Sequence, residues 1–334
     1  MEALRTYLIN PILNVLKFHK FKIFFVFFLT LIFYIVLFPY YQLSGLIESQ
    51  ISKASRGQTQ VSFSDLSLSV IPFGISANNI SIFTPQMPSA LFIKKAVIRP
   101  SIGALLRFKK GGVLQAENIF GGDLILNFSD LGQGTSKNKE SEMVQITSQF
   151  KNINLNKLAT WYKAPFSTSG LLSGNFDFKL DLKAFEQPLG AFQMLGQKVQ
   201  LPSSIKLGQM DLLLPEGEMK KIDFKGKLAN GQLTVLESIL GAPSDVINGK
   251  VKGSMGLTLV SSGGRLQPRP SQYDYSLDLN LDKKTEQKIG TLLTTVLLNG
   301  KGGKSPTVDG GARYLLSIKG FPGSAPNIEP LSSF

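Results

Sequence analysis

The pattern of apolar positions changes sharply along the first sixty residues. Residues 23–38 read IFFVFFLTLIFYIVLF, and no charged residue follows until Glu48. A helix needs roughly 20 apolar residues to cross the hydrocarbon core of a bilayer. The run exceeds the apolar core of a signal peptide and lacks a clear small-x-small cleavage site. Residues 23–43 are therefore predicted to form an uncleaved transmembrane helix, with Tyr40 and Tyr41 at its far interface.

Charges on either side of this segment predict its direction. Four basic residues precede it, namely Arg5, Lys17, Lys20 and Lys22, whereas Glu48 is the first charge after it. Basic flanks stay on the cytoplasmic side of a membrane. We expect residues 1–22 to be a cytoplasmic tail, with Lys20 and Lys22 at the near interface. The chain is then a single-pass membrane protein whose part after about residue 43 is exported.

After a short amphipathic stretch at 43–56, the pattern becomes an alternation of apolar and polar residues. VSFSDLSLSV at 61–70 is followed by a Pro-Phe-Gly turn and by ISANNISIF. This period of two is typical of antiparallel strands with one buried face. It recurs at 92–100, 112–120, 122–129, 143–155, 170–183, 198–207, 210–214, 220–235, 246–262, 273–281 and 311–320. Hairpins are expected at Gly121-Gly122 and at Asn230-Gly231.

Helical spacing returns only in short segments, at 157–164 and 283–298. The fold class expected is mainly β: a transmembrane helix, then a curved, mostly antiparallel sheet, half-barrel or groove-like, with two or three short helices. Residues 44–320 would form the periplasmic β-rich domain. A polar stretch at 130–142 is a possible sub-boundary, and 321–334 is a Pro-rich tail.

The net charge of +13 points to an anionic partner. The first 22 residues contribute four basic residues and Glu2, a net +3, which leaves +10 for the rest. Because this basic part follows a membrane segment, membrane lipid is the expected partner and nucleic acid is not. The densest run holds six cations and no acid in 17 residues: Lys94, Lys95, Arg99, Arg107, Lys109 and Lys110. It is either a contact for anionic lipid or an acidic partner, or an ordinary basic sheet surface.

The residues that most often carry out catalysis are scarce in this chain. There is no cysteine, and the one histidine, His19, lies in the basic flank before the apolar run. Acidic pairs such as Asp177 and Asp181 share one face of a strand and are expected on its solvent side. We therefore expect no catalytic residue, no metal site and no cofactor.

Several stretches together carry a family resemblance. They are LFPY at the end of the apolar run, VSFSDLSLS, PFGISANNISI, PFSTSGLLSGNFDFKLDL and IDFKGKLANGQLTVLESILGAPSDVINGKVKGSMGLTL. Across residues 35–262 the chain resembles the type II secretion system protein N family and, more distantly, AsmA-like envelope proteins. The first resemblance implies an inner-membrane accessory or assembly component that binds other secretion-system subunits. The second implies a β-groove with an apolar interior that binds or transfers phospholipid.

The two functions make different demands on the sheet. A lipid-binding module needs a continuous apolar groove that is open to solvent. An assembly component needs its apolar face closed, which the segments 157–164 and 283–298 could do.

Overall fold

The structure is a computed structural model, and it describes most of the chain after residue 20. The described residues are 21–22, 24–30, 33–34, 37, 39–69, 73–85, 88–105, 109–133, 142–162, 168–202, 204–207, 210–213, 217–262, 265–294, 303–322, 324 and 326–334. Residues 24–30 are helical. Within these ranges, no helix combines the length and apolar character that a membrane crossing needs. The predicted tail 1–22 and span 23–43 fall wholly or partly outside the described residues, and both stay predictions.

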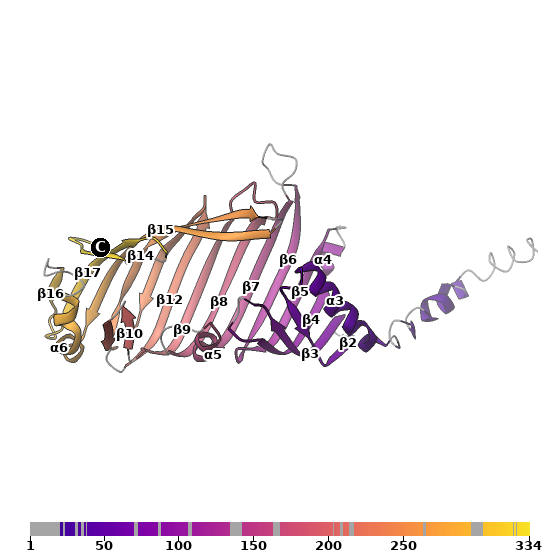
Figure 1. Cartoon of the computed structure of the whole chain (residues 1–334), viewed down its shortest axis with the longest axis horizontal. Coiled ribbons are helices and arrows are strands. Elements are labelled where there is room, and N and C mark those ends of the chain that lie inside the picture. Colours follow the sequence, from indigo (N-terminus) through magenta and orange to yellow (C-terminus); the bar gives the residue numbers. More distant parts are fainter. Residues whose placement is uncertain are drawn as a thin grey trace, which may run out of the picture.

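One large antiparallel sheet forms the body, and its strands follow one another nearly in chain order (Figure 1). Its order is β1-β3-β4-β5-β6-β7-β8-β9-β12-β13-β14-β15-β17-β16, with β10 and β11 as a separate hairpin. The first strands are β1 (Gln60–Ser62), β2 (Asp65–Ser69), β3 (Gly74–Phe83), β4 (Leu91–Pro100), β5 (Gly111–Ile119), β6 (Gly122–Gln133), β7 (Glu142–Asn154), β8 (Ser169–Asp181) and β9 (Leu189–Gln200). The others are β10 (Ser204–Leu207), β11 (Met210–Leu213), β12 (Glu218–Ala229), β13 (Gln232–Leu240), β14 (Ile247–Ser262), β15 (Arg265–Leu281), β16 (Lys304–Pro306), β17 (Ala312–Gly320) and β18 (Asn327–Pro330).

The predicted mainly β fold with a curved, antiparallel sheet is confirmed, and the sheet is open. Of the predicted sub-boundary at 130–142, residues 130–133 belong to β6 and residue 142 to β7, and these two strands are direct neighbours in this sheet. Both ends of the sheet carry two short strands: β1 and β2 pair with β3, and β16 and β18 pair with β17. Short edge strands limit pairing with other chains.

Tight turns join several of the strands, and two were expected. Asn230 and Gly231 have φ of 51° and 70°, as a type I′ turn requires, so the β12–β13 hairpin is confirmed. The β5–β6 hairpin is present too, but its turn residues are Phe120 and Gly121, with φ of 50° and 86°. Gly122 is instead the first residue of β6.

After the helical residues 24–30, four α-helices are described, where two or three were expected: α3 (Ser44–Ala54), α4 (Ile102–Leu105), α5 (Leu155–Tyr162) and α6 (Lys283–Leu292). A 3-10 helix, η2 (Tyr40–Leu43), precedes α3. Figure 1 places α3 and α4 at the N-terminal end of the sheet, α5 at one long edge and α6 at the C-terminal end. The middle strands carry no described helix across them.

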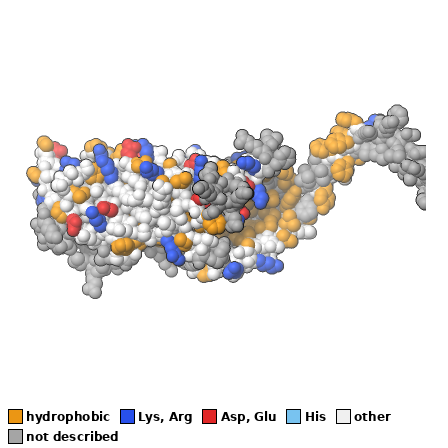
Figure 2. Space-filling model, turned by 90° about the horizontal axis from the view of Figure 1, so that it is seen from above, with side chains coloured by type: hydrophobic (Ala, Val, Ile, Leu, Met, Phe, Trp, Pro, Cys, Tyr) orange, Lys and Arg blue, Asp and Glu red, His pale blue; other side chains and the backbone are white. Residues whose placement is uncertain are grey.

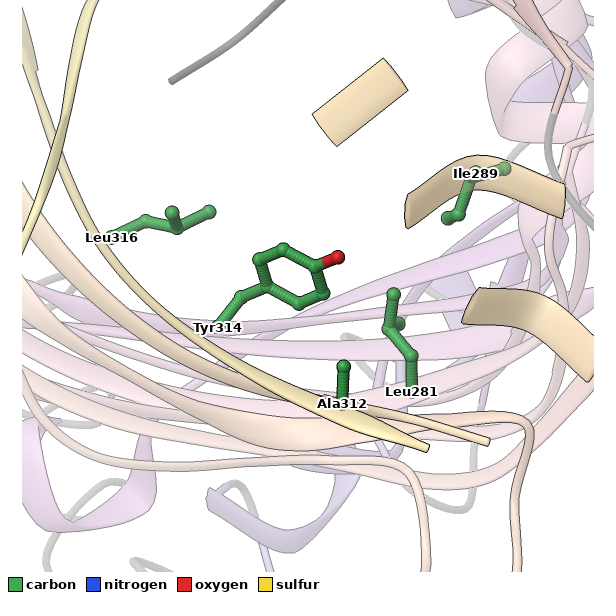
Figure 3. Close-up of a cluster of buried hydrophobic side chains, with 5 residues drawn as sticks. All are labelled: Leu281, Ile289, Ala312, Tyr314 and Leu316. Carbon is green, nitrogen blue, oxygen red and sulfur yellow. The ribbon is translucent and has the colours of Figure 1, made fainter. Parts of the chain in front are cut away.

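Figure 3 shows the inner side of the curve at the C-terminal end. Leu281 of β15 and Ala312, Tyr314 and Leu316 of β17 point to the side on which α6 carries Ile289. All five side chains are buried, and Ala312 and Tyr314 are 0% exposed. α6 starts at a capped position, where Asp282 Oδ1 accepts a hydrogen bond from the Thr285 amide at 2.8 Å.

Two strands begin eight or more residues before the start predicted from the sequence. β9 begins at Leu189, nine residues before the strand expected at 198–207, whose later part forms β10. β15 begins at Arg265, eight residues before the strand expected at 273–281, and includes Pro268 and Pro270. Those prolines pair only with β14 in a hairpin arm that extends past the other strands, so their missing N–H groups break no further ladder. β16 and β18, the latter inside the tail 321–334, were not predicted.

Candidate functional site

A row of uncharged residues crosses the inner face of the sheet from one end to the other. Its members are directly opposite one another on successive strands: Ile75, Ile98, Leu114, Leu126, Ser148, Phe176, Phe192, Gly226, Val235, Gly253, Tyr275 and Ile318. We call these residues the inner row. Directly opposite residues share a face, and Ile318 shares its face of β17 with Leu316 and Tyr314. With about 4.8 Å between strands, the row is roughly 50 Å long.

The opposite face of the same strands is mostly polar. The residues next to the inner row are again directly opposite one another: Val97, Gln115, Ile125, Gln149, Asn175, Gln193, Lys225 and Glu237. We call them the outer row. This face also carries ion pairs, including Lys225–Glu237 and Arg313–Asp278, each at 2.8 Å. Charge is therefore concentrated on the outside of the curve.

Aromatic rings lie over glycines on the inner face. Phe150 is opposite Gly174, and its Cζ is 2.7 Å from the point where a Cβ on that glycine would lie. Phe178 and Phe192 lie in the same way over Gly190 and Gly226, on the next strands. Because glycine lacks a side chain, each ring can rest on the backbone of the neighbouring strand. The middle of the inner face is thus lined by rings rather than filled by them.

The C-terminal end of the inner face is closed by α6. The Tyr314 hydroxyl donates to Glu286 Oε2 at 2.8 Å, and Lys304 forms an ion pair with the same carboxylate. Burial, together with the bond to Glu286, raises the pKa of Tyr314 to about 12. The phenol therefore stays protonated and holds α6 against β17 at neutral pH.

The N-terminal end of the inner face is open by comparison. Ile98 is 61% exposed and Ile75, its direct partner across β3 and β4, is 38% exposed. Seen from above, hydrophobic side chains gather at this end of the body and on the helical segment that leaves it, while Lys and Arg side chains lie beside them and along the rest of the body (Figure 2). Beside them on the same face, Ala96 and Ala116 are only 7% and 2% exposed and belong to a buried cluster with Ile80 and Ile93. The inner face is therefore a groove that α6 covers at one end and that is partly accessible at the other.

α5 does not close this groove. Its Trp161 packs edge-on against Phe120, with ring centroids 5.2 Å apart, and donates to the Ser89 carbonyl at 3.1 Å. Together with Phe92 and Lys157, these residues surround a separate hollow of about 440 Å³ at the sheet edge. The expectation that 157–164 and 283–298 could both close the apolar face is correct only for α6.

The six-cation run is split by the structure. Lys94 and Lys95 lie on β4, and Arg99 lies five residues further along, a distance of about 17 Å from Lys94 on an extended strand. Lys109 and Lys110 are exposed and follow α4, beyond the end of β4 where Arg99 is. Arg107 lies outside the described residues. Lys94 and Lys95 are consecutive on β4 and so point to opposite faces of the sheet, and the described cations of the run do not form one patch.

The predicted interface residues are only partly described. Lys22 is exposed at the start of the helical N-terminal segment, and Lys20 lies outside the described residues, as does His19. Tyr40 is half-buried in η2. The backbone of Tyr41 belongs to the same 3-10 helix, and its side chain is not described. Their role at a membrane interface stays a prediction.

Asp181 differs from its expected place on a solvent face. It is 1% exposed, and its carboxylate accepts hydrogen bonds from the amides of Glu142, Lys183, Phe185 and Glu186 at 2.9–3.1 Å. The alternating pattern placed it outside, but it is the last residue of β8, where the chain turns back over it. In the described part of the chain, no three acidic or histidine side chains come together as a metal site needs.

Sequence reasoning found the apolar face but missed its two most informative features. The sequence shows phenylalanines on one strand and glycines on the next. It does not show which of them are opposite each other, because that depends on the register between the two strands. Ser148, the one serine in the inner row, is 3% exposed, and its Oγ has no hydrogen-bond partner among the described residues.

Comparisons with family models, with curated proteins and with solved structures find no match for this chain.

Proposed function

We propose that the protein binds the hydrocarbon part of membrane lipids in the groove formed by the inner face. The observation that carries the proposal is the inner row: twelve directly opposed residues, none of them charged, on a face whose opposite side holds the ion pairs. A hydrocarbon chain bound to this surface removes apolar area of both the chain and the protein from water, which is favourable.

The size of the groove agrees with this ligand. Its length of roughly 50 Å exceeds the 30 Å hydrocarbon thickness of a whole bilayer, so acyl chains fit lengthwise. A chain of about 15 methylene groups with half of its surface covered gains about 6 kcal/mol, at ~0.8 kcal/mol for each fully buried methylene. That corresponds to a dissociation constant of tens of micromolar. We infer a weakly held ligand that exchanges with the membrane.

Lipid analysis of the full-length protein tests the proposal. The protein is purified with an amphipathic polymer in place of detergent, and extracted lipid is quantified by mass spectrometry. Phe192→Glu places a charge in the inner row, and Gln197→Glu places the same charge at an exposed position on the outer face of the same strand, opposite Lys221. We expect lipid to remain with the wild type and with Gln197→Glu and to be lost from Phe192→Glu. Equal lipid in the two variants, or none in the wild type, would falsify the proposal.

A second candidate is an accessory or assembly component of type II secretion that acts by binding and not by catalysis. It is favoured by the sequence resemblance over residues 35–262, part of which forms η2, α3 and β1 to β3. The polar outer face, with exposed groups such as Asn175 and Glu237, offers a surface for other subunits. Co-purification of secretion-system subunits with a lipid-free protein would support this candidate against the first.

A further inference from the structure

The aromatic–glycine pairs of the inner face form a regular series. Phe150–Gly174, Phe178–Gly190 and Phe192–Gly226 link β7, β8, β9 and β12, and each is a directly opposed pair. Two further pairs occur near the C-terminal end: Tyr275 lies over Gly253 and Tyr273 over Gly320. In all five pairs the ring occupies the space that a side chain on the partner would need.

Contacts between neighbouring rings make this surface continuous. Phe176 and Phe178 stack with centroids 5.4 Å apart, and Tyr273 and Tyr275 stack at 6.1 Å. The interplanar angles of 23° and 27° show that the two rings of each pair are nearly parallel. These side chains are half-buried although the described structure places no helix over the middle strands. The rings are therefore held low, against the sheet.

We propose that these rings set the depth of the groove, and that the groove consequently selects unbranched hydrocarbon chains over branched ones. The inference rests on the proposed function and names the ligand class for that site. A straight chain contacts the rings along its whole length. A chain with methyl branches needs pits in the surface, and the rings occupy the positions above the glycines where such pits would be. We expect the branched chain to bind with about tenfold lower affinity than the straight one, as is typical when a hydrophobic site cannot accommodate an extra methyl or methylene group.

Removing one ring creates such a pit and makes a test possible. Phe192→Ala leaves open space over Gly226, and Phe178→Ala does so over Gly190. Leu195→Ala is the matched control, because Leu195 is a half-buried residue on the other face of the strand that carries Phe192. The probe is parinaric acid, whose fluorescence reports binding, displaced by palmitic acid or by the methyl-branched phytanic acid. The full-length protein is used, held in solution by an amphipathic polymer.

The wild type and Leu195→Ala are expected to bind palmitic acid about tenfold more tightly than phytanic acid. In Phe192→Ala and Phe178→Ala this ratio is expected to approach one through tighter binding of phytanic acid. Equal affinities in the wild type overturn the inference while leaving hydrocarbon binding intact. An unchanged ratio in the two ring variants does the same. If the wild type binds neither acid, the proposed function itself is refuted, and the selectivity with it.

Discussion

Replacing Asp181 by asparagine tests how the strand ends next to the groove are held together. The buried carboxylate accepts four backbone amides, two on each oxygen: Oδ1 from Glu142 and Lys183, Oδ2 from Phe185 and Glu186. An asparagine keeps one acceptor oxygen and turns an NH₂ group toward two N–H donors. Two hydrogen bonds to a charged group are lost, each of them worth roughly 1.5–3 kcal/mol. We expect Asp181→Asn to lower the free energy of unfolding by about 3–5 kcal/mol.

The matched control is Asp177→Asn on the same strand. Asp177 is exposed, and its Oδ1 accepts from Gln145 Nε2 at 2.8 Å, a bond that an asparagine oxygen can also accept. Its expected effect is within about 0.5 kcal/mol. Urea unfolding of the full-length protein in detergent, followed by the fluorescence of Trp161, measures both variants.

The pH dependence of stability provides an independent readout of Asp181. Burial acts to raise the pKa of Asp181, but the four amide donors together outweigh it and hold the pKa below the ordinary value of 3.8. A lowered folded-state pKa contributes stability above 3.8 that is lost as the pH falls through the folded value. Asp181→Asn should lack this acid-dependent loss. A change below 1 kcal/mol, or an acid profile equal to that of the wild type, would refute the role assigned to the four bonds.

Three further substitutions have defined outcomes in the same unfolding assay. Tyr314→Phe removes the donor to Glu286 and should cost about 1–2 kcal/mol. The pKa of Tyr314 is about 12 in the folded protein and 10 for an ordinary tyrosine. The contribution of Tyr314 to the stability of the wild type should therefore be lost as the pH rises from 10 toward 12, and Tyr314→Phe should not show this loss. Ser148→Ala should be neutral or stabilise by about 1 kcal/mol, since the hydroxyl is buried without a described partner. Gly231→Ala should cost about 1 kcal/mol, because alanine is strained at φ of 70°. Unchanged pH dependence for the first, destabilisation for the second or stabilisation for the third would contradict these assignments.

Alternation in the sequence was sufficient to predict most of the sheet. β8 shows why: Phe176, Phe178 and Leu180 face inward, and Asp177 and Lys179 face outward, so its period of two is unambiguous. β9 was misplaced because its inner face includes Gly190 and Gly196 while Ala191 and Leu195 lie on the outer face. With small residues on the inner face and apolar residues on the outer face, the strand lacks the alternation of apolar and polar residues from which strands are predicted.

The site was predictable only in outline. An apolar face follows from alternation, but which ring lies over which glycine depends on register, and β-bulges shift the register, as between Lys225 and Gly226. The closure by α6 is a tertiary contact that no local pattern encodes. The cations of the six-cation run are close in sequence but not in space, because each residue of an extended strand adds about 3.3 Å.

The most direct test of the account asks whether lipid chains contact the inner face and not the outer one. The chain has one tryptophan, so a Trp161→Phe background allows a single reporter to be placed by Phe192→Trp on the inner face or by Gln193→Trp on the outer face. The full-length proteins are reconstituted in nanodiscs made with brominated or with unbrominated phosphatidylcholine. Bromine on the acyl chains should strongly quench the inner reporter and leave the outer one nearly unchanged. Equal quenching at both positions, or none at the inner position, would contradict the assignment of the inner face as a hydrocarbon-binding groove.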